Sequence, residues 1–255
     1  MDLIKKITEY WDRQPCNINH SLSSIDSLNF FKENSHKRYF VEPHIKEFAG
    51  FHKYQGKKVF EIGCGIGADA AEFVKHGAEY VGIDISAESV KLAQKRFELE
   101  QLQGQFHVLS GDQDLTQFGK FDLVYSCGVL HHYPNIGQII ENAHQVLKDN
   151  GEFKFLVYAK NSWKYAMIQK GLDQFEAQAG CPYAQVYTEE EIYRLLKNKF
   201  NVATIKQRHC FMYNVEKYKQ GIFQLEPWFQ IMPEDMRTAI SEHLGWHLLI
   251  ESRKI

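Results

Sequence analysis

The fold is decided by the stretch KVFEIGCGIG, residues 58–67, in which a short apolar run leads directly into three glycines. Lys58–Ile62 has the length and apolar character of a buried strand. Ala70–Val74 follows as the start of a helix, which Gly77 would end at its C′ position. Glycine has no Cβ, so a glycine loop between strand and helix allows a tight turn and a close approach of ligand to backbone. The stretch therefore predicts a ligand-binding loop at the edge of an α/β sheet.

The alternation of strands and helices continues toward the C-terminus. Ser86 is placed to cap a helix, and the Thr188–Glu191 segment has the spacing of a capping box. Strands separated by helices of 10–15 residues predict a parallel sheet with helices on both faces. The further expected strands are Tyr80–Asp84, Phe106–Leu109, Phe121–Tyr125, Phe153–Tyr158, Val202–Ile205 and Trp246–Ile250.

The composition excludes several classes of protein. The chain has 255 residues with a formal net charge of −2, so it lacks the basic field that holds a nucleic-acid backbone. No apolar run reaches the roughly 18–20 residues of a membrane helix, and the N-terminus lacks a signal-peptide core. The five cysteines lie far apart without a CxxC pair, which predicts reduced thiols and no metal site. We therefore expect a cytoplasmic protein without nucleic-acid or membrane partners.

Two acidic positions point to a nucleoside ligand. Asp84 ends the second expected strand, where its carboxylate can accept hydrogen bonds from both ribose hydroxyls. Asp112 follows the third strand and can accept from an adenine amino group, although Gly-Asp is also a common turn. These two residues do not distinguish one nucleoside cofactor from another, because the glycine loop with Ala68 also satisfies the pattern that binds NAD or FAD.

Taken together, these motifs resemble the class I S-adenosylmethionine-dependent methyltransferases of the small-molecule type. The resemblance rests on four segments in order and covers about residues 56–160. It implies a Rossmann-like sheet of seven mostly parallel strands, whose antiparallel last strand would be the one near 246–250. The four segments are Glu61–Gly67, Tyr80–Asp84, Gly111–Asp112 and Phe121–His132.

The resemblance also implies a role for each matched position, with S-adenosylmethionine as the cofactor. The glycine loop would pack on the methionyl part, and Glu61 would hold its amino end. Asp84 would bind the ribose, while Ile85 would lie against the adenine and Asp112 would bind its amino group. The expected cofactor-binding residues are Glu61, Gly63, Cys64, Gly65, Gly67, Asp84, Ile85, Asp112, Gln113 and Cys127, together with Tyr39 and Trp11 from the N-terminal region.

Two adjacent histidines follow the fourth expected strand. His131 and His132 project from the same sheet edge as the cofactor loops, and imidazole can take up a proton near neutral pH. Because neighbouring side chains point in different directions, we expect at most one of them to face the substrate. The alternative is that both orient the loop or cap the helix that begins near Asn135.

Segments outside the expected sheet supply the remaining functional candidates. Residues 1–50 are expected to form a helical lid over the cofactor, followed by the methyltransferase domain at 51–255; the alternative is a flange that covers the sheet edge. Insertions near 160–187 and 212–244 are expected to cap the sheet. Their aromatic side chains would either line an acceptor site or form a second core.

The sequence thus predicts methyl transfer to a small molecule by in-line displacement, with His-assisted deprotonation where the acceptor must lose a proton. Aromatic side chains would suit an apolar, aromatic or cationic acceptor. The acceptor atom and the oligomeric state stay open. Three alternatives are a protein-directed methyltransferase, a non-catalytic cofactor-binding module and an NAD-dependent oxidoreductase. The last would use the Tyr193 and Lys197 pair, which matches Tyr-x-x-x-Lys.

Overall fold

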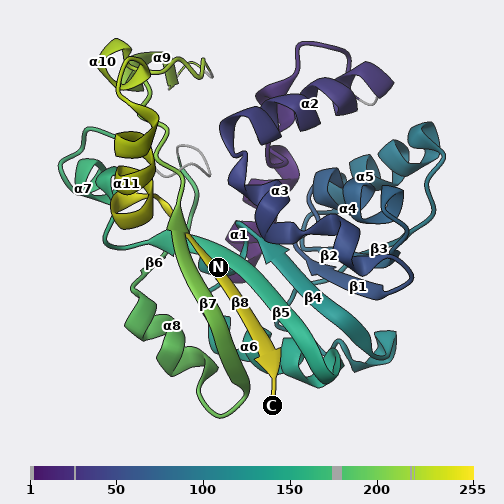
Figure 1. The fold of residues 1–255 in the computed structure, drawn as a ribbon. Helices are drawn as coiled ribbons and strands as arrows, with labels where there is room; N and C mark the ends of the chain where they lie inside the picture. Colours follow the sequence, from purple (N-terminus) through teal and green to yellow (C-terminus); the bar gives the residue numbers. More distant parts are fainter. Residues whose placement is uncertain (1–2, 26, 174–179, 219, 221) are drawn as a thin grey trace.

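A computed structural model describes residues 3–25, 27–173, 180–218, 220 and 222–255. The described residues form one eight-stranded sheet in the order β3-β2-β1-β4-β5-β8-β7, with β6 paired to β5 (Figure 1). β1 to β5 pair in parallel, and β8 runs antiparallel to both of its neighbours. The mostly parallel sheet with an antiparallel last strand is confirmed. The strands are β1 (Lys58–Ile62), β2 (Glu79–Asp84), β3 (Gln105–Val108), β4 (Phe121–Cys127), β5 (Leu147–Ala159), β6 (Val186–Tyr187), β7 (Phe200–Arg208) and β8 (His247–Lys254).

Helices cover both faces of the sheet. On one face α6 and α8 pack against β1, β4, β5 and β8 in the larger apolar cluster, which includes Ile139 and Ile192. On the other face α3, α4 and α5 pack through residues such as Phe48, Phe73 and Val90. The α-helices are α1 (Leu3–Arg13), α2 (Leu28–Val41), α3 (His44–Ala49), α4 (Ala68–Lys75), α5 (Ala87–Glu100), α6 (Ile136–Val146), α7 (Trp163–Gln169), α8 (Glu189–Leu196), α9 (Val215–Tyr218), α10 (Pro227–Gln230) and α11 (Glu234–Leu244); short 3-10 helices are η1 (Ile18–His20), η2 (Phe51–Tyr54), η3 (Thr116–Phe118) and η4 (Leu130–His132).

The predicted helix boundaries are confirmed by their caps. The Ser86 side chain accepts a hydrogen bond from the Ser89 backbone at the start of α5. Thr188 and Glu191 form the reciprocal bonds of a capping box at α8. Gly77 takes a positive φ of 86° just after α4, the left-handed position that glycine adopts without a Cβ penalty. These local signals fix where the helices begin and end.

The strand that was not expected is β6. It is two residues long and pairs in parallel with Tyr158 and Ala159 at the carboxyl end of β5. The pairing of β4 with β5 ends at Leu156, so the backbone of β5 beyond that residue has no partner from β4, and β6 pairs with it there. A two-residue strand has no periodicity of its own, which is why the expected sheet had seven strands.

Segments outside the sheet gather at its carboxyl end. In Figure 1, α2 and α3 lie at the end toward which β4 points, and α7, α9, α10 and α11 lie beside β7 at the same end. The expected cap near 160–187 includes residues 174–179, which lie outside the described residues. In the described part of the chain, no helix has both the length and the apolar character needed to span a bilayer.

Candidate functional site

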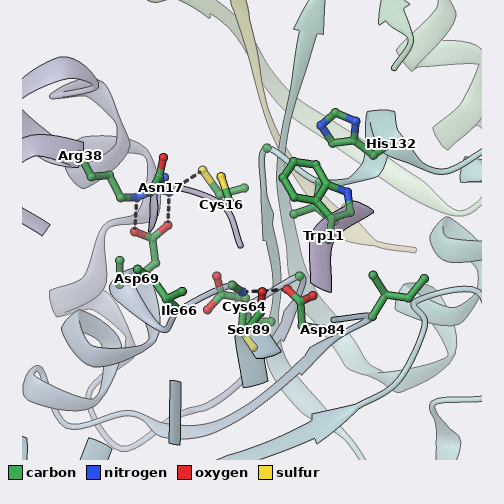
Figure 2. Close-up of a pocket in the computed structure, with 18 of the residues that line it drawn as sticks. Trp11, Cys16, Asn17, Arg38, Cys64, Ile66, Asp69, Asp84, Ser89 and His132 are labelled. Carbon is green, nitrogen blue, oxygen red and sulfur yellow. Dashed lines mark hydrogen bonds and ion pairs between the residues drawn. The ribbon is translucent and has the colours of Figure 1, made fainter. Parts of the chain in front are cut away.

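A cavity lies at the carboxyl ends of β1, β2 and β4, beneath the N-terminal helices. Its empty space is about 790 Å³, counting the part open to solvent. Arg38 and Asp69 lie on one side, Trp11 and His132 on the other, and Cys64 and Asp84 between them (Figure 2). The lining residues are Ile7, Trp11, Cys16, Asn17, Arg38, Glu61, Gly63, Cys64, Gly65, Ile66, Ala68, Asp69, Asp84, Ile85, Ser89, Cys127, Gly128, Val129, His132 and Tyr133.

Two glycines of the first loop are required for different reasons. Both have positive φ, 79° at Gly63 and 52° at Gly65. A Cβ on Gly63 would lie 2.4 Å from Cγ2 of Val129, so this position permits close packing between the loop and the chain after β4. A Cβ on Gly65 would meet no atom within 4 Å. Gly65 therefore borders the cavity and leaves room there for a ligand to approach the backbone.

Asp84 holds the loop and the start of the following helix together. Its Oδ2 accepts a hydrogen bond from the Gly65 backbone at 2.9 Å, and its Oδ1 accepts from the Ser86 backbone at 2.9 Å (Figure 2). Burial nevertheless raises the pKa of Asp84 to about 6, because the two backbone donors only partly replace water. Each carboxylate oxygen keeps a lone pair that a ligand hydroxyl can use.

Glu61 is a second acidic group on the cavity wall. Its side chain is buried, and its Oε2 accepts a hydrogen bond from the Tyr80 hydroxyl at 2.5 Å. Burial raises the pKa of Glu61 well above its ordinary value, and the negative charge of Asp69 adds to the shift. Glu61 can therefore hold a cationic group in the cavity, because a positive charge would stabilise the ionised carboxylate against both its burial and the nearby charge of Asp69.

The ion pair between Arg38 and Asp69 forms the wall opposite His132. Arg38 Nη2 lies 2.8 Å from Asp69 Oδ2, and its Nε donates to Oδ1 at 3.1 Å. The hydroxyls of Tyr39 and Tyr125 also donate to the Asp69 carboxylate, at 2.9 and 3.0 Å. Although burial alone would raise it, these partners, Arg38 first, hold the pKa of Asp69 below its ordinary value. Arg38 thus presents a fixed positive charge to the cavity.

The two histidines have different surroundings. The His132 Nδ1 lies 2.8 Å from the Tyr183 carbonyl, which can only accept, so Nδ1 carries the proton and Nε2 keeps its lone pair. Burial lowers the pKa of His132 to about 4. Its ring lies 5.2 Å from that of Trp11. His131 is fully buried, with its ring centroid 3.6 Å from that of Tyr158.

Most of the predicted site residues come together, and five do not. Trp11, Glu61, Gly63, Cys64, Gly65, Asp84, Ile85, Cys127 and His132 line the cavity. Within the described residues, Tyr39, Gly67, Asp112, Gln113 and His131 lie outside its lining. Tyr39 acts behind the wall through Asp69. Asp112 accepts from the Ser110 hydroxyl at 2.5 Å and Gln113 from the Ser110 backbone at 3.1 Å, so these side chains close their own turn.

The sequence analysis missed the charged pair and most of the N-terminal contribution. Asp69 sits in the first turn of α4, where an acidic residue is also an ordinary helix-stabilising choice. Arg38 lies in α2, 31 positions away from Asp69. No local pattern connects the two, so only the packing of α2 over the glycine loop reveals them.

The aromatic residues of the late insertions favour the second-core alternative. Trp163, Tyr213 and Tyr218 form a separate buried cluster around Lys164, whose Nζ lies 4.7 and 4.6 Å from the two tyrosine rings. In the parts of the insertions that the structure describes, none of these side chains lines the cavity. Tyr193, central to the oxidoreductase alternative, is exposed on α8 and also lies away from the cavity.

Comparison with known proteins agrees with the geometry. A family model described as a methyltransferase domain matches residues 60–153. The ubiquinone biosynthesis O-methyltransferase of Psychrobacter cryohalolentis is 29% identical over 149 residues, which cover 57% of this chain and 57% of that protein. The corresponding enzyme of Coxiella burnetii is 27% identical over 44% of this chain and 47% of its own length. The chain thus matches about half the length of these curated relatives.

Solved structures with the same fold match over the whole chain. Magnesium protoporphyrin IX methyltransferase from Synechocystis, crystallised with S-adenosylmethionine, has a TM-score of 0.62 at 16% identity and covers 100% of this chain and 98% of its own. Geranyl diphosphate C-methyltransferase from Streptomyces coelicolor has a TM-score of 0.63 at 13% identity with the same coverage, 100% and 98%. Residues 60–153 thus match a methyltransferase domain, and the whole chain has the fold of these solved methyltransferases.

Proposed function

We propose that this protein transfers the methyl group of S-adenosylmethionine to a hydroxyl group of a small, largely apolar molecule. The observation that carries the proposal is the cavity, where an acidic group on β2, the glycine loop and the chain after β4 meet His132 and Trp11. When bound, the cofactor supplies an electrophilic methyl group on a sulfonium. The hydroxyl acceptor is proposed because the curated relatives carry the name O-methyltransferase.

The residues present fit such a cofactor. Asp84 would bind the ribose hydroxyls, and Ile85 would lie against the adenine. Glu61 would hold the ammonium of the methionine part, and Arg38 its carboxylate, because each meets the opposite charge. The support for this orientation is that Glu61 and Arg38 line the cavity together with the chain around Cys127.

His132 is proposed to orient the acceptor hydroxyl. Its Nε2 lone pair is available because Nδ1–H donates to the Tyr183 carbonyl. With a pKa of about 4, His132 is neutral near pH 7 and a weak base, so its Nε2 accepts a hydrogen bond from the hydroxyl and takes up that proton only as the oxygen–methyl bond forms and the hydroxyl becomes strongly acidic. Holding the acceptor oxygen in line with the methyl group supplies the larger effect, since such positioning is worth about 7–11 kcal/mol.

We further propose that residues 1–50 include a lid over the cavity. Trp11, Cys16 and Asn17 cover the cavity from the N-terminal segment. Two hydrogen bonds that tie α1 to the start of α5 are long: 3.3 Å from Ser86 Oγ to the Trp11 carbonyl and 3.4 Å from the Glu88 backbone to Asp12. Long bonds of this kind are weak, so the segment can move to admit ligands.

The test combines binding with turnover. Calorimetric titration with S-adenosylmethionine, S-adenosylhomocysteine and NAD(H) should show binding of the two sulfur nucleosides alone. Incubation with S-adenosylmethionine and a panel of phenols, catechols and quinols should then release S-adenosylhomocysteine, with the methylated product identified by mass spectrometry. Binding of NAD(H) alone would overturn the proposal. Cofactor binding with methylation of peptides instead, or with no turnover on either panel, would favour a protein-directed enzyme or a non-catalytic module.

A further inference from the structure

We propose that His44, His209 and His247 form a binding site for one divalent transition-metal ion, of which Zn²⁺ is the reference case. One ligand nitrogen from each of the three residues lies within 4.8 Å of the other two. The site lies at the carboxyl end of β7 and the start of β8, outside the lining of the cofactor cavity. The sequence analysis predicted no metal site from the spacing of the cysteines and did not consider these histidines, which are far apart in the chain.

The folded chain brings the three residues together from separate elements. His44 begins α3, His209 follows the last residue of β7, and His247 is the first residue of β8. The pairing of β7 with β8 places Arg208 opposite His247, and the Trp246 backbone donates to the His209 carbonyl at 2.9 Å. The packing of α3 against this end of the sheet then adds His44. The trio is therefore held by backbone hydrogen bonds and not by surface side chains alone.

The spacing of the nitrogens suits a tetrahedral ion. Zn–N bonds of about 2.0–2.1 Å place two ligand nitrogens about 3.3 Å apart. His44 Nε2 and His247 Nδ1 are 3.0 Å apart, so a change of a few tenths of an ångström would accommodate the ion between this pair. The ring of His209 is stacked on that of His247 at 4.5 Å and lies 5.3 Å from that of His44, so it would have to turn out of the stack to direct a nitrogen lone pair at the ion.

The Glu42 carboxylate lies near the ring nitrogen of His247 that points away from His44, and a small shift would bring the two within hydrogen-bond distance. With Nδ1 of His247 directed at His44, its Nε2 faces Glu42 Oε1 at 3.8 Å. A ligand histidine typically donates its second ring N–H to a carboxylate, which fixes the ring and strengthens the ligand. Glu42 also lies 3.5 Å from Arg38, a residue of the cofactor cavity wall, so the carboxylate is held in place from both sides.

The backbone at His209 is consistent with a constrained site. Its φ of 75° is in the left-handed region, which few residues other than glycine adopt. Such conformations are strained and gather at functional sites. Here the turn carries the chain out of β7 and places the imidazole beside that of His247.

The donor set selects the class of metal. Three imidazoles favour Zn²⁺, Co²⁺, Ni²⁺ or Cu²⁺, whereas Mg²⁺ and Ca²⁺ prefer oxygen ligands. His209 and His247 are buried, and His44 is partly exposed, which leaves a route from solvent. Three protein ligands would leave a fourth position for water, as in zinc sites that are not closed.

The test titrates the purified full chain with Co²⁺, followed by visible absorption, and with Zn²⁺, followed by calorimetry. We expect one ion per chain at a site of nitrogen ligands, and no binding of Mg²⁺ at the same concentrations. His44→Gln and His209→Asn should each weaken binding by about 10–100-fold or more, since losing a ligand costs at least as much as losing a residue that only holds a ligand in place. Asparagine is chosen at position 209 because it tolerates the left-handed backbone.

His52→Gln is the matched control, because His52 is exposed on η2 and lies outside the trio. Circular dichroism and S-adenosylhomocysteine binding report whether each variant is folded. The proposal is overturned if the wild type shows no saturable Co²⁺ or Zn²⁺ binding, or if His44→Gln and His209→Asn bind like His52→Gln. The readout is the metal itself, so its failure is distinguishable from failure of the proposed methyl transfer.

Discussion

Replacing Asp84 with asparagine tests the proposed ribose contact with little change in shape. In the folded protein, the carboxylate accepts from the Gly65 and Ser86 backbones at 2.9 Å each. The amide has one acceptor oxygen, so one of these donors loses its partner, at a cost of about 1–3 kcal/mol. The substitution also removes a buried carboxylate whose pKa is raised from 3.8 to about 6. Removing this charge should stabilise the folded protein by about 3 kcal/mol at neutral pH. The two terms nearly cancel, so we expect Asp84→Asn to stay folded.

The expected loss lies in cofactor affinity. A hydrogen bond to a charged group contributes about 1.5–3 kcal/mol, so removing the charge should weaken S-adenosylhomocysteine binding about 10–150-fold at pH 8. In the wild type, protonation should have a similar effect, because about nine-tenths of a carboxyl group is protonated one unit below its pKa. Affinity should therefore fall about tenfold between pH 8 and pH 5.

The stability of the unliganded wild type should change in the opposite direction. The folded-state pKa of Asp84 is raised by burial, so between about pH 4 and pH 6 the folded protein holds a proton that the unfolded chain has released. This contribution to stability is present at low pH and is lost as the pH rises through about 6. The same ionisation that destabilises the empty site thus prepares it for the ribose.

Calorimetric titration with S-adenosylhomocysteine at pH 5 and pH 8 gives the affinities, and thermal unfolding at the same values gives the stabilities. Asp114→Asn is the control, because Asp114 is an exposed carboxylate outside the cavity. Any pH dependence that persists in Asp84→Asn would come from Glu61, the other cavity acid with a raised pKa. Equal affinity of wild type and Asp84→Asn at pH 8, with both folded, would refute the ribose assignment.

Three further outcomes are expected. Gly63→Ala should lower the unfolding free energy by about 2–5 kcal/mol, because its Cβ would clash with Val129 in a left-handed backbone. Gly65→Ala should lower it by only about 1–2 kcal/mol but should weaken cofactor binding. Thermal unfolding measures the first effect, and calorimetric titration measures the second. His132→Ala should lower kcat by about 10²-fold, at the lower limit of the range for acid–base groups, without changing cofactor affinity. His131→Ala should lower Tm without changing kcat, because His131 is buried outside the cavity. Similar losses of kcat in both variants would contradict the assignment. Maleimide labelling followed by mass spectrometry should find Cys16 the most reactive thiol and show protection by S-adenosylhomocysteine, because it is the exposed cysteine that lines the cavity.

The sheet could be predicted because its signals are local. The strand Lys58–Ile62 was expected with the boundaries that the structure has, and the caps at Ser86 and Thr188 were identified from neighbouring residues. Burial on both faces gives parallel strands a continuous apolar run, which is readable within five or six residues. β6 escaped prediction because two residues carry no such pattern.

The cofactor side of the cavity was predictable for a related reason. The carboxyl ends of adjacent parallel strands meet at one edge, so the order of the strands alone brings the glycine loop, Asp84 and Cys127 together. Asp112 and Gln113 show the limit of this rule. They follow the correct strand, but their side chains turn back to Ser110, and a Gly-Asp sequence specifies such a turn as readily as a ligand contact.

The side of the cavity formed by the N-terminal helices depends on contacts that no short segment encodes. Trp11 reaches His132 from α1, and Arg38 reaches Asp69 from α2, each through packing between segments distant in the chain. The same holds for His44, His209 and His247, which meet only because β7 pairs with β8 beneath α3. In the proposed function, the sheet edge and Arg38 bind the cofactor, while Trp11 on α1 faces the acceptor. We therefore expect substitutions at Trp11 to change which acceptor is used more than they change cofactor affinity, a difference that a comparison of acceptor KM with S-adenosylhomocysteine Kd would measure.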